Sequence, residues 1–313
     1  MKMTQGKLKR LNAVADKNGV ISAAAMDQRG SLQKSIAKEK GIDPKSVTPE
    51  MMSEFKVAVS RILTPHASAI LLDPEFGLEA VKAKASHAGV LLAYEQTGYD
   101  QTQEGRIPTL IPNWTVKKCI ESGGNCLKVL LYYSPFESEP VKDIKHAFVA
   151  RIGAECAHYE VPFFLEFVGY DPAGGDEKGL EFAKQKPAIV SGSMKEFSKP
   201  EYNVDVLKVE VPVNMEYVEG SRANKSGKVA YTKKEAMDHF RRAAVIPGQQ
   251  ARPFPDLVLQ QWTQIDRGKM SEVENLHLEA PGGFRLAKRA HGGLRTASVV
   301  LSSGERQTGG QGW

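Results

Sequence analysis

Six apolar runs, each followed by a stretch with helical periodicity, are the feature that most limits the folds open to this chain. The runs lie at residues 19–27, 67–73, 89–95, 126–135, 161–169 and 204–213. Between the first two, Thr48 and Pro49 form a helix-start signal, a capping hydroxyl followed by proline. Strands that alternate with helices form parallel sheets, because each helix returns the chain to the edge where the next strand begins. We therefore predict an α/β protein with a parallel sheet.

Two parallel architectures fit this pattern, an open doubly wound sheet and a TIM (β/α)8 barrel. The doubly wound sheet loses support because no Gly-x-Gly-x-x-Gly follows the first strand and no Walker-type glycine loop occurs. The barrel gains support from charged residues near the downstream ends of the apolar strands, where a barrel has its catalytic mouth. These residues are Asp27, Asp73, Glu95, Glu166 and Lys208. We predict the barrel.

Composition excludes several classes of protein. The chain has 42 basic and 37 acidic residues without a block of like charges, so we expect no nucleic-acid partner. Residues 1–20 lack the apolar core of a signal peptide, and no run approaches the ~20 apolar residues of a membrane span. We expect a cytoplasmic protein that does not bind membranes. The histidines and cysteines show no metal-ligand spacing, which argues against a metal-dependent mechanism.

The run at 204–213 carries charge inside an apolar strand. At a period of two, Leu207 and Val209 share one face, while Lys208 and Glu210 share the other. An edge strand with solvated charges is one explanation of this pattern. In a barrel, the outer face meets helices and the inner face holds the chemistry, so Lys208 would point inward. Burial there would lower its proton affinity and make it a nucleophile toward a carbonyl, which suggests a Schiff base.

Two more strands place a charged side chain on an apolar face. Glu166 shares its face with Phe164 and Val168, which favours a raised proton affinity and a role in proton transfer. Lys128 is a second inward cation. Each of these residues alone fits a buried structural ion pair equally well. Together with Lys208, on three different strands, they indicate an active site.

Arg29 follows the first strand and is a candidate phosphate ligand. A guanidinium offers paired donors that match two phosphate oxygens. A surface arginine in a loop is the alternative reading of the same position.

Six segments spread over about residues 8–243 carry a family resemblance. They are Ala-Met-Asp-Gln-Arg-Gly at 25–30, Leu-Leu-Asp-Pro-Glu-Phe-Gly at 71–77, Tyr-Glu-Gln-Thr-Gly-Tyr-Asp at 94–100, Leu-Lys-Val-Leu-Leu-Tyr-Tyr-Ser-Pro at 127–135, Phe-Leu-Glu-Phe-Val-Gly-Tyr-Asp at 164–171 and Asp-Val-Leu-Lys-Val-Glu-Val-Pro-Val-Asn-Met at 205–215. They resemble class I tagatose-1,6-bisphosphate aldolases. The resemblance implies a (β/α)8 barrel that cleaves a ketose bisphosphate to dihydroxyacetone phosphate and glyceraldehyde 3-phosphate, with no metal or other cofactor.

The resemblance also implies roles for particular residues. It implies that Lys208 is the lysine that forms the Schiff base and that Glu166 is the glutamate that transfers protons. It also implies that Lys128 is an assisting lysine and that Asp27 is an active-site carboxylate. It places Gln28 and Arg29 in a turn that contacts a substrate phosphate. The preferred stereoisomer, the use of another phosphorylated ketose and assembly into a homo-oligomer stay open.

The resemblance stops near residue 244. We assign residues 1–244 to the first six βα units of an aldolase barrel and residues 245–313 to a divergent tail in place of the last two units. The tail is rich in Gly, Gln and Arg, and its run at 299–304 only partly resembles the family's seventh strand.

We hypothesise that this tail is the end of the gene read in a shifted frame, which the nucleotide sequence around codons 245–255 tests. In the family, the last two loops hold a substrate phosphate, so a protein without them would lose binding energy used for positioning. A catalytically impaired sugar-phosphate-binding protein, or a non-functional remnant, is therefore the alternative to an active aldolase.

Overall fold

The centre of the molecule is one sheet whose strands follow one another in chain order, from β1 to β8. The structure, a computed structural model, describes residues 3–99, 103–246, 257–261 and 298–301. The strands are β1 Ala23–Met26, β2 Ala69–Leu72, β3 Gly89–Ala93, β4 Cys126–Tyr132, β5 Phe163–Val168, β6 Val206–Val209, β7 Leu257–Gln261 and β8 Ser298–Leu301. Strands β1 to β7 pair in parallel. This confirms the prediction of a parallel α/β sheet of the TIM-barrel type.

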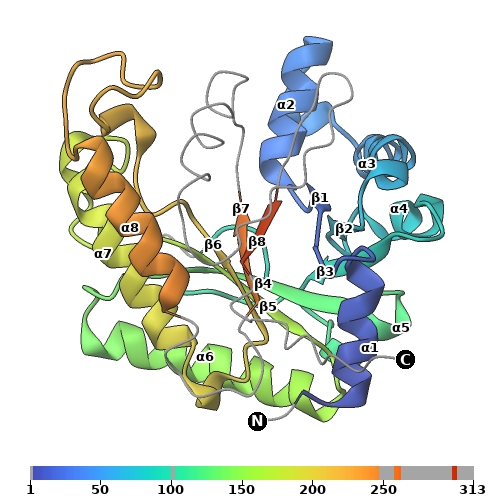
Figure 1. Cartoon of the computed structure of the whole chain (residues 1–313). Coiled ribbons are helices and arrows are strands. Elements are labelled where there is room, and N and C mark those ends of the chain that lie inside the picture. The colour runs from blue at the N-terminus through green and yellow to red at the C-terminus, as the bar shows by residue number, and fades with distance from the viewer. Residues whose placement is uncertain (1–2, 100–102, 247–256, 262–297, 302–313) are drawn as a thin grey trace, which may run out of the picture.

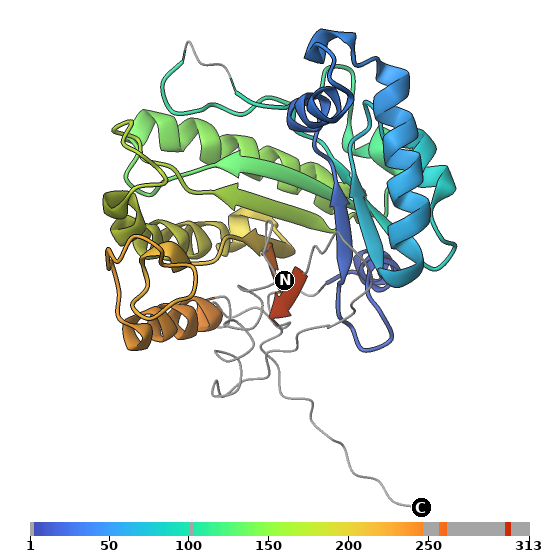
Figure 2. The same cartoon turned by 90° about the horizontal axis from the view of Figure 1, so that it is seen from above.

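Helices surround the outer side of the curved sheet, as the view from above shows (Figure 2). They are α2 Gly30–Lys40, α3 Pro49–Leu63, α4 Leu78–Ala83, α5 Val116–Glu121, α6 Glu139–His158, α7 Leu180–Phe197 and α8 Lys233–Val245, while α1 Gln5–Val14 lies at the end where the strands begin. Helix α3 begins at the predicted signal, because the Thr48 hydroxyl accepts a hydrogen bond from the Met51 amide at 3.3 Å. Among the described residues, no helix is both long and apolar enough to cross a membrane.

Side-chain alternation along the strands gives the sheet two different faces. On the outer face, Leu207 and Val209 join a large apolar cluster that includes Phe197 of α7. On the inner face, Val206 and Phe164 belong to a second apolar cluster near the start of the strands. The predicted orientation of the Lys208 strand is thus confirmed. Strand β6 lies between β5 and β7, so the edge-strand alternative is wrong.

Helix α1 closes the end of the barrel at which the strands begin (Figure 1). Its last residue, Val14, is fully buried in the inner apolar cluster. Lys7 forms an ion pair of 2.6 Å with Asp205, whose carboxylate also accepts a hydrogen bond from the Phe163 amide at 2.8 Å. The cavity of the barrel is therefore left to the opposite end.

Helix α7 contains a proline in its interior. It runs unbroken from Leu180 to Phe197 through Pro187. A proline inside a helix costs about 3 kcal/mol. The helix buries a row of apolar side chains that offsets this cost, namely Phe182, Ala183, Pro187, Ile189, Val190, Met194 and Phe197.

The end of the sheet departs from a regular barrel. Strand β7 pairs in parallel with β6, but β8 pairs antiparallel with β7, and the pairings of the described strands do not join β8 to β1. All eight strands of a (β/α)8 barrel are parallel, so β8 is not an eighth barrel strand. It is formed by the run that partly resembles the family's seventh strand. The other expectations for residues 245–313 fall outside the described residues, and the domain boundary stays a prediction.

Candidate active site

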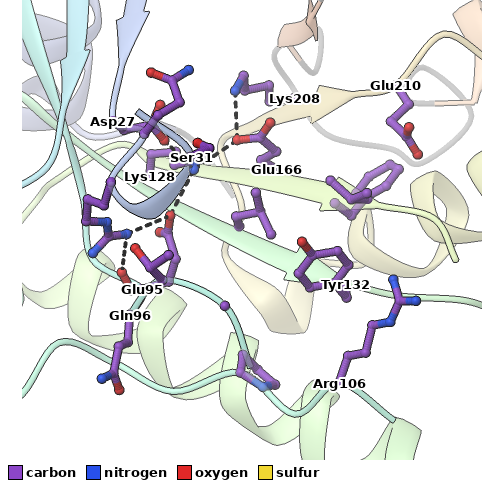
Figure 3. A pocket seen from close by; sticks show the side chains of 18 of the residues that line it. Asp27, Ser31, Glu95, Gln96, Arg106, Lys128, Tyr132, Glu166, Lys208 and Glu210 are labelled. Carbon is purple, nitrogen blue, oxygen red and sulfur yellow. Dashed lines mark hydrogen bonds and ion pairs between the residues drawn. The ribbon is translucent and has the colours of Figure 1, made fainter. Parts of the chain in front are cut away.

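A cavity of about 430 Å³ lies at the ends of the strands, where the sequence predicted the mouth of the barrel. Its wall is formed by residues in or just after β1, β3, β4, β5 and β6. All six residues predicted to act in the site line it, namely Asp27, Gln28, Arg29, Lys128, Glu166 and Lys208. Figure 3 shows how several of them point toward one another.

Lys208 and Glu166 face each other across two neighbouring strands. Glu166 of β5 is in register with Lys208 of β6, and parallel neighbours in register share a face about 4.8 Å apart. The Lys208 amine lies 2.7 Å from the Glu166 carboxylate, and both side chains are at least nine-tenths buried. This register could not be read from either strand alone, although each strand's own phase placed its charged residue inward.

Lys128 is the centre of a charge cluster that the lining residues form. Its amine lies 2.8 Å from Asp27, 2.9 Å from Glu95 and 3.0 Å from Glu166. Burial by itself would lower the pKa of Lys128, but these three carboxylates together raise it well above the ordinary lysine value. Lys128 therefore stays an ammonium ion, with one carboxylate for each of its three N–H donors.

The predicted raised proton affinity of Glu166 is wrong. Burial acts to raise its pKa, but the positive charges of Lys128 and Lys208 lower it by more than burial raises it. The pKa of Glu166 therefore lies below the ordinary glutamate value. The same balance lowers the pKa of Asp27. The strand pattern showed the apolar neighbours that desolvate Glu166, but not the two lysines supplied by adjacent strands. In the resting site, Glu166 and Asp27 are both ionised.

Glu95 belongs to this cluster, although the sequence placed it only at the mouth of the barrel. It is buried, and burial raises its pKa despite the neighbouring Lys128. Its Oε2 atom has no hydrogen-bond partner among the described residues. Glu95 lies two residues after Ala93, which is the β3 residue in register with Lys128. Because side chains alternate along a strand, this spacing indicates that Glu95 points to the same inner face. Carboxyls whose pKa values move in opposite directions can supply both an acid and a base to one site.

Arg29 lies inside the protein, not on its surface. Its Nη1 donates to the Glu75 carboxylate at 2.6 Å, and its Nη2 donates to the Glu95 carbonyl oxygen at 2.9 Å. The Nε group is buried without a partner among the described residues. Both terminal nitrogens of Arg29 are thus anchored, while its Nε–H donor is unpaired among the described residues.

The comparisons with known proteins agree with this geometry. Residues 21–247 match the model of the DeoC/LacD family of aldolases. The chain belongs to this family. This family member is 50% identical over 238 residues to tagatose 1,6-diphosphate aldolase 2 of Enterococcus faecalis, a match that covers 76% of the chain and 70% of the relative. It is 46% identical over 250 residues to the tagatose 1,6-diphosphate aldolase of Streptococcus agalactiae, covering 79% and 75%.

Solved structures with the same fold include two fructose-bisphosphate aldolases. One is described as a Schiff base-forming fructose-1,6-bisphosphate aldolase, with a TM-score of 0.51 and coverage of 86% of this chain and 87% of that one. The other, from Slackia heliotrinireducens, has a TM-score of 0.54 and coverage of 89% and 79%. Each is 13% identical in sequence, so these likenesses concern the fold of the DeoC/LacD chain.

A second ion pair supports the site from behind. Lys56 of α3 and Asp73 after β2 pair with each other, and both side chains are fully buried. Lys56 also donates to the carbonyl oxygens of Met26 and Gln28, each at 2.8 Å. These two carbonyls flank Asp27, so Lys56 fixes the backbone that carries this carboxylate.

Asp73 extends this support to Arg29. One Asp73 oxygen accepts hydrogen bonds from the amides of Glu75 and Phe76, and Glu75 in turn holds Arg29. The sequence identified Asp73 as a strand-end carboxylate but missed its partner. The available signal was the buried series Met52, Lys56 and Ser60, spaced by four along α3.

Lys56→Met is expected to lower the free energy of unfolding by about 3–5 kcal/mol, because it leaves a fully buried carboxylate without its counter-charge. Denaturant unfolding followed by circular dichroism measures this loss. Lys82→Met is the matched control: it removes an exposed pair with Glu79 and should cost less than about 1 kcal/mol. An equal, small loss in both variants would show that the buried pair does not hold this region together.

Lys128→Met is expected to make stability fall as pH rises, relative to the wild type. In the wild type, the pKa values of Asp27 and Glu166 are lower in the folded protein than in the unfolded chain, where they are about 4. The stability that this difference adds is fully present above pH about 4 and is lost as pH falls through the pKa values of the folded protein. Glu95, whose pKa is raised, acts in the opposite sense.

Without Lys128, burial dominates, so the folded pKa values of the three carboxyls rise above the unfolded ones. Their contribution is then complete below pH about 4 and is lost as pH increases. Denaturation midpoints at several pH values between 4 and 8 measure the trend. Lys142→Met, which breaks the solvent-facing pair with Glu139, should keep the wild-type trend. A Lys128→Met profile parallel to the wild type would contradict the expectation.

Proposed function

We propose that this DeoC/LacD family chain is a class I aldolase that cleaves tagatose 1,6-bisphosphate to dihydroxyacetone phosphate and glyceraldehyde 3-phosphate through a Schiff base on Lys208. The relatives that are 46–50% identical carry the name tagatose 1,6-diphosphate aldolase. The observation that carries the proposal is the buried Lys208 amine 2.7 Å from Glu166, in a cavity at the mouth of a barrel. We also propose that the protein acts in the cytoplasm.

Lys208 is the nucleophile because its surroundings differ from those of Lys128. Three carboxylates hold the Lys128 amine as an ammonium ion. Lys208 pairs with Glu166, which it shares with Lys128. Glu166 is ionised in the resting site and lies 2.7 Å from the Lys208 amine, so it can accept a proton from this amine. The free amine then attacks the C2 carbonyl of the substrate and forms a carbinolamine.

Glu166 transfers the protons of the covalent steps. As an acid it returns its proton to the hydroxyl of the carbinolamine, which leaves as water and gives a protonated imine. When the C4 hydroxyl loses its proton to a base, the C3–C4 bond breaks and its electron pair moves to the imine. Glyceraldehyde 3-phosphate leaves and an enamine remains. Protonation at C3 and addition of water release dihydroxyacetone phosphate and restore Lys208.

The other members of the cluster position charge around these steps. Lys128 and Asp27 form an ion pair of 2.8 Å that faces the same cavity, so Lys128 places a fixed positive charge beside the substrate. We assign one substrate phosphate to the turn of Gln28 and Arg29. The free, buried Nε group of Arg29 supports this assignment.

Borohydride trapping tests the proposal directly. The folded protein is incubated with dihydroxyacetone phosphate, reduced, digested and analysed by mass spectrometry. An adduct on the peptide that contains Lys208 is expected. Folded protein without an adduct would overturn the aldolase assignment and favour the alternative, a sugar-phosphate-binding protein without catalysis. A panel of ketose bisphosphates and monophosphates, assayed in parallel, identifies the preferred substrate.

A further inference from the structure

Arg106 lines the active-site cavity but takes no part in the steps described above. In Figure 3 it lies next to Tyr132, on the opposite side of Glu166 from Asp27 and Glu95. It comes from the segment between β3 and α5, which carries Glu95 at its start. The charge cluster and Arg106 therefore occupy different ends of one cavity.

The backbone at this position is held in a costly conformation. Gly105 and Arg106 both adopt left-handed dihedrals, with φ of 88° and 50°. A residue with a side chain pays roughly 1–2 kcal/mol for this conformation. A side chain at Gly105 would also collide with Val141, because its Cβ atom would lie 2.4 Å from the Val141 Cγ1 atom. The turn thus brings Arg106 to the cavity at a cost that an ordinary surface loop does not require.

A platform of three tyrosines fixes the Arg106 guanidinium. Its central carbon lies 4.3 Å from the ring centroid of Tyr170 and 5.2 Å from those of Tyr99 and Tyr132. Its Nη2 donates to the Glu177 carboxylate at 2.5 Å, and Nη1 lies 3.5 Å from the same carboxylate. Because arginine has five N–H donors, this contact leaves donors for another acceptor. Arg106 and Glu177 are both partly exposed, so an anionic ligand can reach the pair.

The other cations that line the described part of the cavity already have roles. Lys128 is bound by three carboxylates, and Lys208 is the proposed nucleophile. Arg29 is more than nine-tenths buried, is anchored to Glu75, and is assigned to the other substrate phosphate through its unpaired Nε group. A ketose bisphosphate carries its phosphates at opposite ends, with the reacting carbonyl next to one of them. The phosphate on the far end needs a cation away from Lys208, and Arg106 is in that position.

We propose that Arg106 binds the phosphate of the aldehyde half of the substrate, the phosphate remote from the carbonyl that reacts with Lys208. This inference rests on the proposed function. The phosphate would accept hydrogen bonds from Arg106 either in place of the Glu177 carboxylate or beside it. The tyrosine platform would keep the guanidinium in place. Arg106 would thus select bisphosphates over ketose 1-phosphates.

The test compares Arg106→Gln with the wild type on a ketose 1,6-bisphosphate and on the matching ketose 1-phosphate. A loss of about 10- to 100-fold in kcat/KM is expected for the bisphosphate, as for a lost charge-assisted hydrogen bond. Less than a twofold change is expected for the monophosphate. Arg106→Lys, which keeps the charge but not the fork, should recover part of the loss. Arg241→Gln, which breaks the exposed pair with Asp238, is the matched control and should leave both substrates unaffected.

An equal loss on both substrates, or no loss on the bisphosphate, would overturn the role of Arg106. A binding measurement separates this result from failure of the aldolase proposal. sn-Glycerol 1-phosphate, the reduced and stable form of the aldehyde half, is titrated into wild type and Arg106→Gln by calorimetry. Binding that weakens about tenfold or more in the variant supports the phosphate site even if the wild type cleaves neither sugar. Binding that is absent from the wild type, or unchanged in the variant, argues against it.

Discussion

Lys208→Met is expected to abolish cleavage, with a loss of roughly five to six orders of magnitude in kcat, because no covalent intermediate can form without the amine. The variant should still fold, since the Glu166 carboxylate keeps its contact of 3.0 Å with Lys128. Steady-state assays with a coupled enzyme measure the loss, and borohydride trapping should yield no adduct.

Lys208→Arg separates the chemistry of this residue from its charge. Arginine keeps an ion pair with Glu166, but its guanidinium stays protonated and does not act as the nucleophile. Equal inactivity of both variants would assign the effect to the missing amine. An adduct that moves to Lys128, or activity that survives in either variant, would contradict the assignment.

Glu166→Gln is expected to lower kcat by about 10²- to 10⁴-fold, the usual contribution of a positioned proton-transfer group. Glutamine has nearly the same shape and can still accept a hydrogen bond from Lys208, but it cannot carry a proton. Trapping with dihydroxyacetone phosphate should therefore be slower but still occur at Lys208. Pre-steady-state trapping, quenched with borohydride at successive times, measures this rate.

Glu166→Asp serves as the control because it restores a carboxylate one methylene further away. Partial recovery of kcat is expected for it. Because the pKa of Glu166 lies below the ordinary value, wild-type activity should not lose this base as pH falls from 8 toward 5. Glu166→Gln with activity close to the wild type would require another base in the cavity.

The sequence was sufficient for features that depend on one strand at a time. A period of two placed Lys208 and Glu166 inward correctly, because one face of each strand is apolar and meets helices. The same reasoning found the mouth of the barrel from the charged strand ends. Helix α7 continues through Pro187 because burial along the whole helix outweighs the helix-breaking tendency of one proline.

Features that depend on several elements at once could not be read from the sequence. The direction of the Glu166 pKa shift follows from lysines on two other strands. The support given by Lys56 follows from a helix that packs behind the first strand. Arg106 lies in a loop without any periodic pattern, and its surroundings combine three separate segments.

The closed lower end of the barrel has a consequence for the kinetic order of the proposed reaction. Helix α1, with the Lys7–Asp205 pair and the inner apolar cluster, fills the end opposite the cavity, so in the described part of the chain the substrate meets Lys208 from the mouth of the barrel. The dihydroxyacetone phosphate half stays attached to Lys208 after the carbon bond breaks. Glyceraldehyde 3-phosphate must then depart first. In the synthetic direction, the ketone must load before the aldehyde, which makes the condensation a compulsory-order process.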